Sequence, residues 1–290
     1  MKDESGVNSR SRRADAVKVT KVPKIQAGEI ELFYEEYGRG SEPLILVHGL
    51  TQSHIHWHAL IEDLPLDKLR VMAFDARGHG RSDAPSTGYA MSQQADDIVA
   101  AARALGLDSF HFVGHSMGCQ IGAALALRHP DCLRTLVLVA SAPLAGARAM
   151  DPYLRETARA SIGDADTYWA WVQTWAARPI APELLSYFKS KYEPMTIEYL
   201  DEAFEGICED LSAGLGEINV PTLVVAGDRD VLKDANLLAA ASIPNCALHV
   251  FYRTGHMIEM ERPAELAALI VDFIEHGVPA AGHRPTLTNR

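Results

Sequence analysis

One serine in this chain stands in a pattern that can activate it as a nucleophile. Ser116 is the centre of residues 114–118 (Gly-His-Ser-Met-Gly), which directly follow the apolar run 110–113. A helical pattern begins near Cys119, so we expect a strand, a tight turn and a helix. Glycines two residues before and after the serine leave room for a strained backbone at the turn. The pattern predicts a reactive hydroxyl at the carboxyl end of a strand, beside the positive end of a helix dipole.

Short apolar runs alternate with helical patterns around this serine. The runs typical of buried strands are 44–47, 71–74, 110–113, 136–139 and 222–226, with a weaker sixth at 248–251. Helical spacing covers 91–105, 119–128 and 263–275. Apolar strands separated by helices indicate a mostly parallel sheet covered on both faces. Two runs of mixed polarity, 19–25 and 29–37, predict an antiparallel hairpin at the sheet edge.

The alternation is interrupted between residues 143 and 213, where helical patterns and aromatic residues replace the strands. Four of these aromatics, Trp169, Trp171, Trp175 and Tyr187, are candidates for a substrate pocket, although the same side chains can pack helices on one another. We interpret 143–213 as a helical cap inserted into a core formed by 19–142 and 214–276. Residues 1–18 are expected to form a flexible arm and 277–290 a C-terminal tail.

Composition and charge exclude several functions. The 290 residues carry a net charge of −11, which argues against binding to nucleic acid or to an anionic membrane surface. No run reaches the roughly 18 apolar residues of a membrane span, and the N-terminus lacks a secretory signal. The four cysteines include no CxxC pair. We therefore expect a soluble, cytoplasmic protein that acts on a small molecule, with its oligomeric state left open.

Five motifs in a fixed order carry a resemblance to a known family. The motifs are residues 47–49 (VHG), 75–82 (DARGHGRS), 114–118 (GHSMG), 227–230 (GDRD) and 255–256 (GH). With these motifs the chain resembles the α/β-hydrolase superfamily, and within it the serine esterase, cofactor-free haloperoxidase and C–C hydrolase branches, from about Ile25 to Ile274. The resemblance implies an α/β-hydrolase fold: a mostly parallel central sheet flanked by helices, with an inserted helical cap.

The resemblance assigns partners to Ser116. His256, between the last predicted strand and the final helix, matches the family's general base. The acid that orients this histidine should follow the run 222–226, where Asp228 and Asp230 are both available. The family places it at the last position of G-x-x-D, which is Asp230. Glu259 is expected at the surface or as a helix cap.

The oxyanion of an acyl-transfer reaction needs two backbone N–H donors. In the family the residue after the nucleophile supplies one, which is Met117 here. The residue after His48-Gly49 supplies the other, which is Leu50. This chemistry requires no metal and no organic cofactor.

Two further patterns suggest sites that we interpret as structural. His54 and His58 are spaced i, i+4, as zinc ligands on a helix can be, but no third ligand is evident nearby in the sequence. We therefore assign the alternating His54, His56 and His58 to the start of a helix. Residues 78–82 are glycine-rich like a phosphate-binding loop but lack its lysine, and the family uses them as a turn.

These assignments predict two-step acyl transfer through an acyl-enzyme on Ser116. The aromatic cap favours a medium-sized, largely apolar carboxylic ester or a lactone as the substrate. The main alternative is C–C bond hydrolysis of a β-diketone or a dienoate, which uses the same residues, and perhydrolysis is a further side activity. A different class of function also remains, because a non-catalytic receptor on this fold can keep the same motifs.

Overall fold

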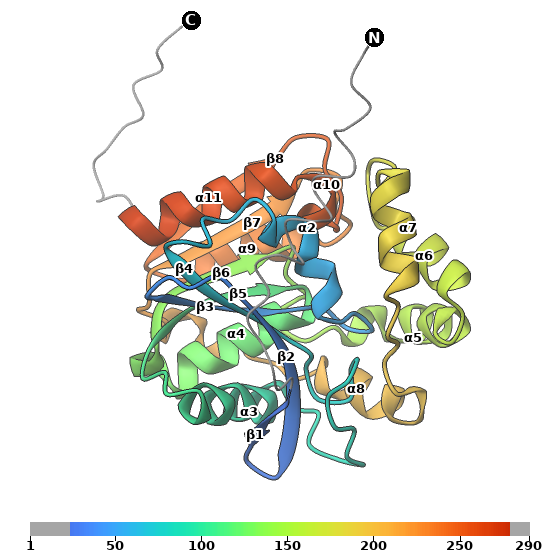
Figure 1. Cartoon of the computed structure of the whole chain (residues 1–290), viewed down its shortest axis with the longest axis horizontal. Coiled ribbons are helices and arrows are strands. Elements are labelled where there is room, and N and C mark those ends of the chain that lie inside the picture. Colours follow the sequence, from blue (N-terminus) through green and yellow to red (C-terminus); the bar gives the residue numbers. More distant parts are fainter. Residues whose placement is uncertain (1–23, 279–290) are drawn as a thin grey trace, which may run out of the picture.

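The expected sheet is present and has eight strands in the computed structural model, which describes residues 24–278 (Figure 1). The strands lie in the order β1-β2-β4-β3-β5-β6-β7-β8. The pairs β1–β2 and β2–β4 are antiparallel, and all the others are parallel. The strands are β1 (Lys24–Ala27), β2 (Ile30–Tyr37), β3 (Glu42–Val47), β4 (Leu69–Phe74), β5 (Phe110–His115), β6 (Leu133–Val139), β7 (Thr222–Gly227) and β8 (Cys246–Phe251).

Two layers of helices cover this sheet because its central strands are apolar on both faces. In β3, Leu44 and Leu46 belong to the apolar layer of α2 and α11, whereas Ile45 and Val47 belong to that of α3 and α4. The mostly parallel, doubly covered sheet predicted from the sequence is therefore confirmed. The helices outside 143–213 are η1 (His54–Trp57), α2 (His58–Ile61), α3 (Met91–Ala104), α4 (Met117–Arg128), η2 (Pro130–Cys132), α9 (Lys233–Ser242), α10 (Ile258–Glu261) and α11 (Pro263–His276).

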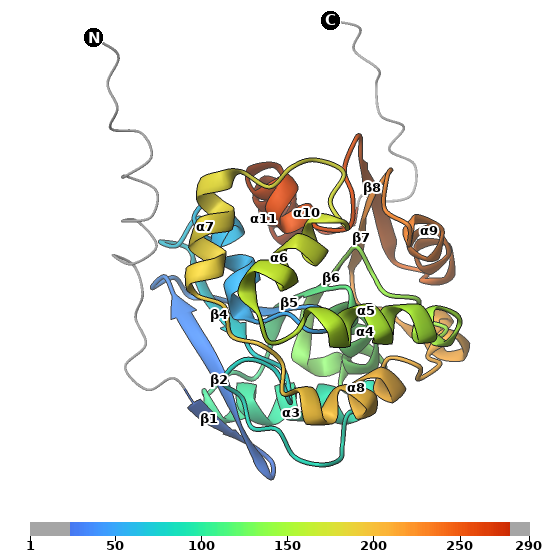
Figure 2. The same cartoon turned by 90° about the vertical axis from the view of Figure 1, so that its right-hand side faces the viewer.

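Residues 143–213 contain helices and no strand (Figure 2). They contribute to the same cavity as the segments that follow β3, β5, β6 and β7, so they lie over the carboxyl ends of the parallel strands. The helices of this segment, called the cap below, are η3 (Arg148–Met150), α5 (Asp151–Ser161), α6 (Ala165–Gln173), α7 (Pro182–Ser190), η4 (Ile197–Tyr199), α8 (Leu200–Gly206) and η5 (Ser212–Glu217), the last reaching beyond residue 213.

Some of the segments predicted from the sequence lie at the two ends of the chain. The arm predicted for 1–18 and residues 279–290 of the predicted tail lie outside the described residues. Of the strand predicted at 19–25, only residues 24 and 25 are described, and they begin β1. Helix α9 was not predicted. Between residues 24 and 278, no helix combines the length and apolar character needed to cross a membrane.

Close contact of α4 with β5 and with β3 depends on two glycines. A Cβ atom on Gly114 would lie 2.2 Å from the carbonyl oxygen of Gly118, and one on Gly118 would lie 2.2 Å from the carbonyl oxygen of Val47. Both clashes are with backbone atoms, which cannot move aside as a flexible side chain can. The turn between the strand and the helix is therefore possible only without side chains at these positions.

We predict that Gly114→Ala lowers the free energy of unfolding by about 2–3 kcal/mol, because the added methyl group forces β5 and α4 apart. Gly216→Ala is the matched control, since Gly216 is exposed and a Cβ atom there would meet nothing within 4 Å. That control should change stability by less than about 1 kcal/mol. Urea denaturation of both variants checks the prediction, and equal stabilities would contradict it.

Candidate active site

Ser116 has the strained backbone that the sequence pattern predicts. Its φ of 52° and ψ of −111° are values that residues with a side chain rarely adopt. The conformation is held by its neighbours: the N–H of Ser116 donates to the carbonyl oxygen of Val139 at 3.1 Å, and its own carbonyl accepts from the N–H groups of Cys119 and Ala142. The serine therefore lies at the tip of a fixed turn at the N-terminus of α4.

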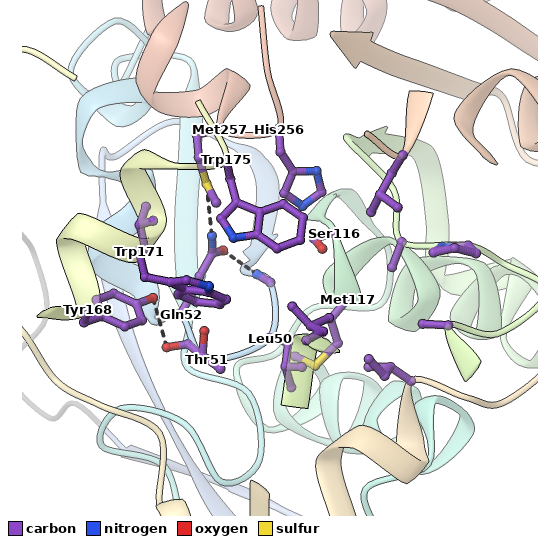
Figure 3. Close-up of a pocket in the computed structure, with 18 residues that line it drawn as sticks. Leu50, Thr51, Gln52, Ser116, Met117, Tyr168, Trp171, Trp175, His256 and Met257 are labelled. Carbon is purple, nitrogen blue, oxygen red and sulfur yellow. Dashed lines mark hydrogen bonds between the residues drawn. The ribbon is translucent and has the colours of Figure 1, made fainter. Parts of the chain in front are cut away.

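Ser116 and His256 line one cavity between the core and the cap (Figure 3). The cavity contains about 600 Å³ of space, counted out to its open mouth. Figure 3 shows that the imidazole of His256 and the hydroxyl of Ser116 face the same cavity. The core contributes Gly49, Leu50, Thr51, Gln52, Ser116, Met117, Ala142, Leu232, His256 and Met257, and the cap contributes Pro143, Ala147, Leu154, Tyr168, Trp171, Val172, Trp175 and Ile207.

Asp230 contacts the opposite side of the His256 ring. Its Oδ2 lies 3.0 Å from Nδ1 of His256, and its Oδ1 accepts the N–H of Leu232 at 2.9 Å. Burial opposes ionisation of this carboxyl group, but the attraction of His256 and the two hydrogen bonds outweigh it and hold the pKa of Asp230 below its usual value. An ionised carboxylate at Nδ1 favours the tautomer of His256 in which Nδ1 carries the proton and Nε2 faces away from Asp230.

Asp228, the other acid available after β7, has a different position. Its Oδ1 accepts the N–H of Thr254 at 3.1 Å, and its Oδ2 lies 3.6 Å from Nε of Arg229. The hydrogen bond with Thr254 joins the turn after β7 to the loop that carries His256. The structure therefore brings together Ser116, Asp230 and His256, while Asp228 supports the loop from outside.

The backbone near Ser116 approaches it closely on the side of β3. A Cβ atom on Gly49 would lie 3.0 Å from Cβ of Ser116 and 2.9 Å from Oε1 of Gln52, so a side chain here would be tightly packed. The N–H of Gly49 donates to Oε1 of Gln52 at 2.7 Å, which fixes the loop. Leu50 follows this glycine, and Leu50 and Met117 both line the cavity next to the serine (Figure 3).

The cap contacts the loop of His256 directly. The N–H of His256 donates to the carbonyl oxygen of Trp175 at 2.8 Å. The carboxylate of Glu261 accepts the N–H of Gly255 from the loop at 2.9 Å and that of Ala177 from the cap at 3.1 Å. Displacement of the cap would therefore also displace the histidine.

Only two of the four predicted cap residues line the cavity. Trp171 and Trp175 do, but Trp169 is fully buried between His56 and Phe188, with ring centroids 5.0 Å from each. Trp169 and Trp171 are two residues apart on α6, about 200° around the helix, so they face opposite sides.

Tyr187 does not line the cavity either, because its hydroxyl group forms a 2.7 Å hydrogen bond with Nδ1 of His58 in the core. The cavity is also lined by Tyr168, Leu154 and Gln52, which were not predicted. Nothing in their local pattern distinguishes them from packing residues.

The glycine-rich segment 78–82 is a turn filled by the protein itself. The carboxylate of Asp75 accepts the N–H of Arg81 at 3.0 Å, and a Cβ atom on Gly80 would lie 2.2 Å from Oδ2 of Asp75. This carboxylate occupies the space that a phosphate would need. His79 accepts the N–H of Thr51 on Nε2 at 3.1 Å, so its contacts support the loop that lines the cavity.

The surface position expected for Glu259 is wrong. Its side chain is fully buried, and its Oε2 lies 3.5 Å from Nε2 of His115. His115 also lies 2.9 Å from the carbonyl oxygen of His256 and 3.0 Å from Oε1 of Gln52. The pair forms a polar cluster directly behind the cavity, and nothing in the sequence indicated that the loop folds back over β5.

Burial, and after it the negative charges of Glu261 and Asp230, raises the pKa of Glu259 to about 8. An unfolded glutamate ionises near 4.5. Between these two values the unfolded chain has lost this proton and the folded chain retains it. Stability therefore falls as pH rises through this window, and it changes no further once both states are ionised.

We predict that Glu259→Gln gains stability relative to the wild type as pH rises from 5 to 8, by about 1–3 kcal/mol in total. Urea denaturation at several pH values measures the difference between the two proteins. Glu183→Gln, at an exposed position on α7, is the control and should show a constant difference. A pH-independent difference for Glu259→Gln would contradict the assignment of a buried proton.

Comparisons with known proteins agree with this architecture. The sequence profile described as the alpha/beta hydrolase fold matches residues 42–158. N-formylmaleamate deformylase of Pseudomonas putida is 30% identical over 87% of this chain and 96% of its own length. The 2-hydroxy-6-oxononadienedioate/2-hydroxy-6-oxononatrienedioate hydrolase 2 of Pseudomonas putida is 29% identical over 87% of this chain and 95% of its own length.

Among solved structures, the enol-lactonase from Burkholderia xenovorans LB400 superposes with a TM-score of 0.78. The two sequences are 26% identical, and the match covers 87% of this chain and all of the lactonase. The similarity thus extends over nearly the whole length of each relative and over both the core and the cap of this chain. The chain belongs to the α/β-hydrolase family and is a hydrolase.

Proposed function

We propose that this protein is a serine hydrolase that cleaves an uncharged, largely apolar carboxylic ester or lactone of medium size. The cavity that contains Ser116 and His256 carries the proposal. None of the 18 residues that line it is a lysine or an arginine, and most are aliphatic or aromatic. Such a lining favours a neutral molecule with a reactive carbonyl group over an anion.

In the proposed mechanism, His256 takes the proton of Ser116 as the serine oxygen attacks the carbonyl carbon. Asp230, at 3.0 Å from Nδ1, orients the ring and stabilises the imidazolium that forms. The backbone N–H groups of Leu50 and Met117 stabilise the oxyanion. His256 then returns the proton to the leaving alkoxide, and a water molecule repeats the sequence on the acyl-enzyme.

The main alternative is hydrolysis of a C–C bond in a β-diketone or a dienoate. A relative 29% identical to this chain is named as the hydrolase of a dienedioate. That substrate carries two carboxylates. Moving such an anion into this cavity would remove its water without a cationic partner from the lining residues, which is unfavourable. The chain's net charge of −11 adds long-range repulsion. The cavity therefore favours the neutral ester or lactone.

Labelling with a fluorophosphonate probe tests the catalytic assignment. We expect the wild type to be labelled and Ser116→Ala to be unlabelled. Asp230→Asn should lower kcat for an ester by about 10³- to 10⁴-fold, because the wrong tautomer of His256 is then favoured. Asp228→Asn is the matched control and should lower it by less than about tenfold. An unlabelled wild type would indicate a non-catalytic receptor, and equal losses in the two aspartate variants would refute the choice of Asp230.

A matched pair of substrates tests the charge preference. The p-nitrophenyl ester of pentanoic acid and the mono-p-nitrophenyl ester of glutaric acid have the same chain length and differ at the chain end, where the second carries a carboxylate. We expect kcat/KM to be about 100-fold or more higher for the neutral ester, since the carboxylate must lose its hydration. A ring-cleavage dienedioate serves as the third substrate. Preference for either anion would contradict the proposed substrate class.

A further inference from the structure

A cluster of buried side chains lies behind the loop that lines the cavity and takes no part in the proposed reaction. His54 and His58 come from consecutive turns of η1 and α2, as their spacing in the sequence implies. The third member, Glu35, comes from β2, an antiparallel strand far from the serine. One ligand atom from each of the three lies within 4.8 Å of the other two, and all three residues are buried. The third ligand that the local sequence lacks is therefore supplied by the fold.

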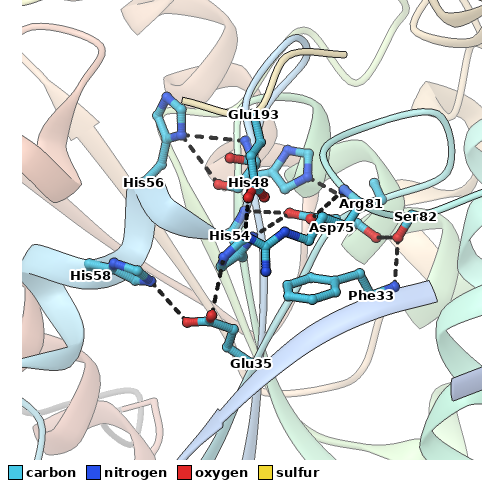
Figure 4. A network of polar contacts seen from close by, with 12 residues as sticks. Phe33, Glu35, His48, His54, His56, His58, Asp75, Arg81, Ser82 and Glu193 are labelled. Carbon is cyan, nitrogen blue, oxygen red and sulfur yellow. Dashed lines mark hydrogen bonds and ion pairs between the residues drawn. The ribbon is translucent and has the colours of Figure 1, made fainter. Parts of the chain in front are cut away.

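We propose that Glu35, His54 and His58 form a structural Zn²⁺ site. The carboxylate of Glu35 lies 3.7 Å from Nε2 of His54 through Oε1 and 3.3 Å from Nε2 of His58 through Oε2 (Figure 4). Nitrogen and oxygen ligands at the usual zinc distances are about 3.3 Å apart around a tetrahedral ion. The separation to His58 matches that spacing, and the separation to His54 exceeds it by 0.4 Å. The two ring nitrogens thus face the two oxygens of one carboxylate.

The outer contacts of both histidines also match those of metal ligands. A ligand histidine usually donates its second ring N–H to a carboxylate or another oxygen, which fixes the ring. Nδ1 of His54 lies 2.8 Å from Oδ1 of Asp75, and Nδ1 of His58 lies 2.7 Å from the hydroxyl of Tyr187. In both rings Nε2 is thereby directed to Glu35. Two independent rings with this arrangement are the observation that distinguishes the cluster from a pair of packed histidines.

A fourth oxygen is within reach. The hydroxyl of Tyr37 lies 2.9 Å from Nε2 of His58 and contacts the carboxylate of Glu35. Imidazole nitrogen and carboxylate oxygen are donors that Zn²⁺ takes in proteins, and this hydroxyl is placed to be the fourth donor of the set. The charges also balance, because the carboxylates of Glu35 and Asp75 neutralise a divalent ion where neither is exposed to solvent.

A second grouping, His54 with Asp75 and Glu193, is less suited to the metal. The carboxylate of Glu193 is paired with Arg81, so its charge is already balanced. Asp75 also accepts the backbone N–H groups of His54 and Arg81. We therefore assign Asp75 to the outer contacts of the site and Glu35 to the metal itself.

The proposed ion would connect three parts of the molecule. It would join β2 to η1 and α2, and through the hydrogen bond of Tyr187 it would fix α7 of the cap to the core. The segment 49–52, which lines the cavity, lies just before His54. The site therefore has a structural role and does not enter the reaction.

Metal titration of the full chain tests this site. Protein purified without a histidine tag is treated with a chelator, dialysed, and titrated with ZnCl₂. We expect about one Zn²⁺ per chain by mass spectrometry of the dialysed protein and a rise in Tm of about 3–8 °C. Glu35→Gln and His58→Gln should each weaken binding by about 100-fold or more. His129→Gln, which alters a histidine paired with Asp96 elsewhere on the molecule, is the matched control and should bind as the wild type does.

A spectroscopic readout on the wild type keeps the test decisive if a variant fails to fold, which far-UV circular dichroism would show. Co²⁺ in place of Zn²⁺ should give the intense visible absorption of a tetrahedral site, and added Zn²⁺ should abolish it. Absence of metal binding by the wild type would overturn the proposal and leave a hydrogen-bonded cluster held by protons. Uptake that is unchanged in folded Glu35→Gln and His58→Gln would also overturn it.

Discussion

The strained turn at Ser116 is the constraint on which the rest of the site depends. A φ of 52° places the hydroxyl at the tip of the turn, and the chain maintains this only because glycines at 114 and 118 allow backbone to touch backbone. Gly49, after the neighbouring strand β3, also lies close to Ser116, where a Cβ atom would be 3.0 Å from that of the serine. Three separate segments thus approach one serine at positions occupied by glycine. The strain at one residue is offset by the packing of the whole sheet around it.

The turn at Ser116 and the sheet could be predicted from the sequence because their signals are local. Five apolar runs, the glycine spacing around Ser116 and the order of the motifs each need only a few neighbouring residues to be recognised. Helix α9 was missed because only Asn236 and Ala239 are buried on it, which leaves almost no apolar periodicity. The contacts of side chains that meet across long stretches of sequence were harder to predict. Glu259 and Glu35 each meet a histidine distant in sequence, and no local pattern encodes those contacts.

The aromatic pattern of the cap predicted that this segment lines a cavity, but it did not predict which aromatic residues do so. The segment contributes to the cavity, yet helical geometry places some of its tryptophans in the lining and another in the packing between helices. Trp171 faces the cavity, whereas Trp169 anchors α6 against His56 and Phe188. Packing and lining were both open interpretations of the aromatics, and a helix of nine residues accommodates both on opposite faces. Residue type alone therefore does not predict which residues of a cap line a pocket. The position of each residue around the helix axis determines whether it faces the cavity.

Two buried acids near the cavity illustrate how environment sets protonation. Asp230 and Glu259 are both almost inaccessible to solvent, so burial favours the neutral form of each. Asp230 receives the N–H of Leu232 and the ring of His256 within hydrogen-bonding distance, and these contacts keep its pKa low. Glu259 lies 3.5 Å from His115, and burial together with the charges of Glu261 and Asp230 raises its pKa. The proton that Glu259 retains lowers the negative charge behind the cavity. In the proposed mechanism, the imidazolium of His256 is therefore stabilised by Asp230, whose carboxylate lies 3.0 Å from Nδ1 of the ring.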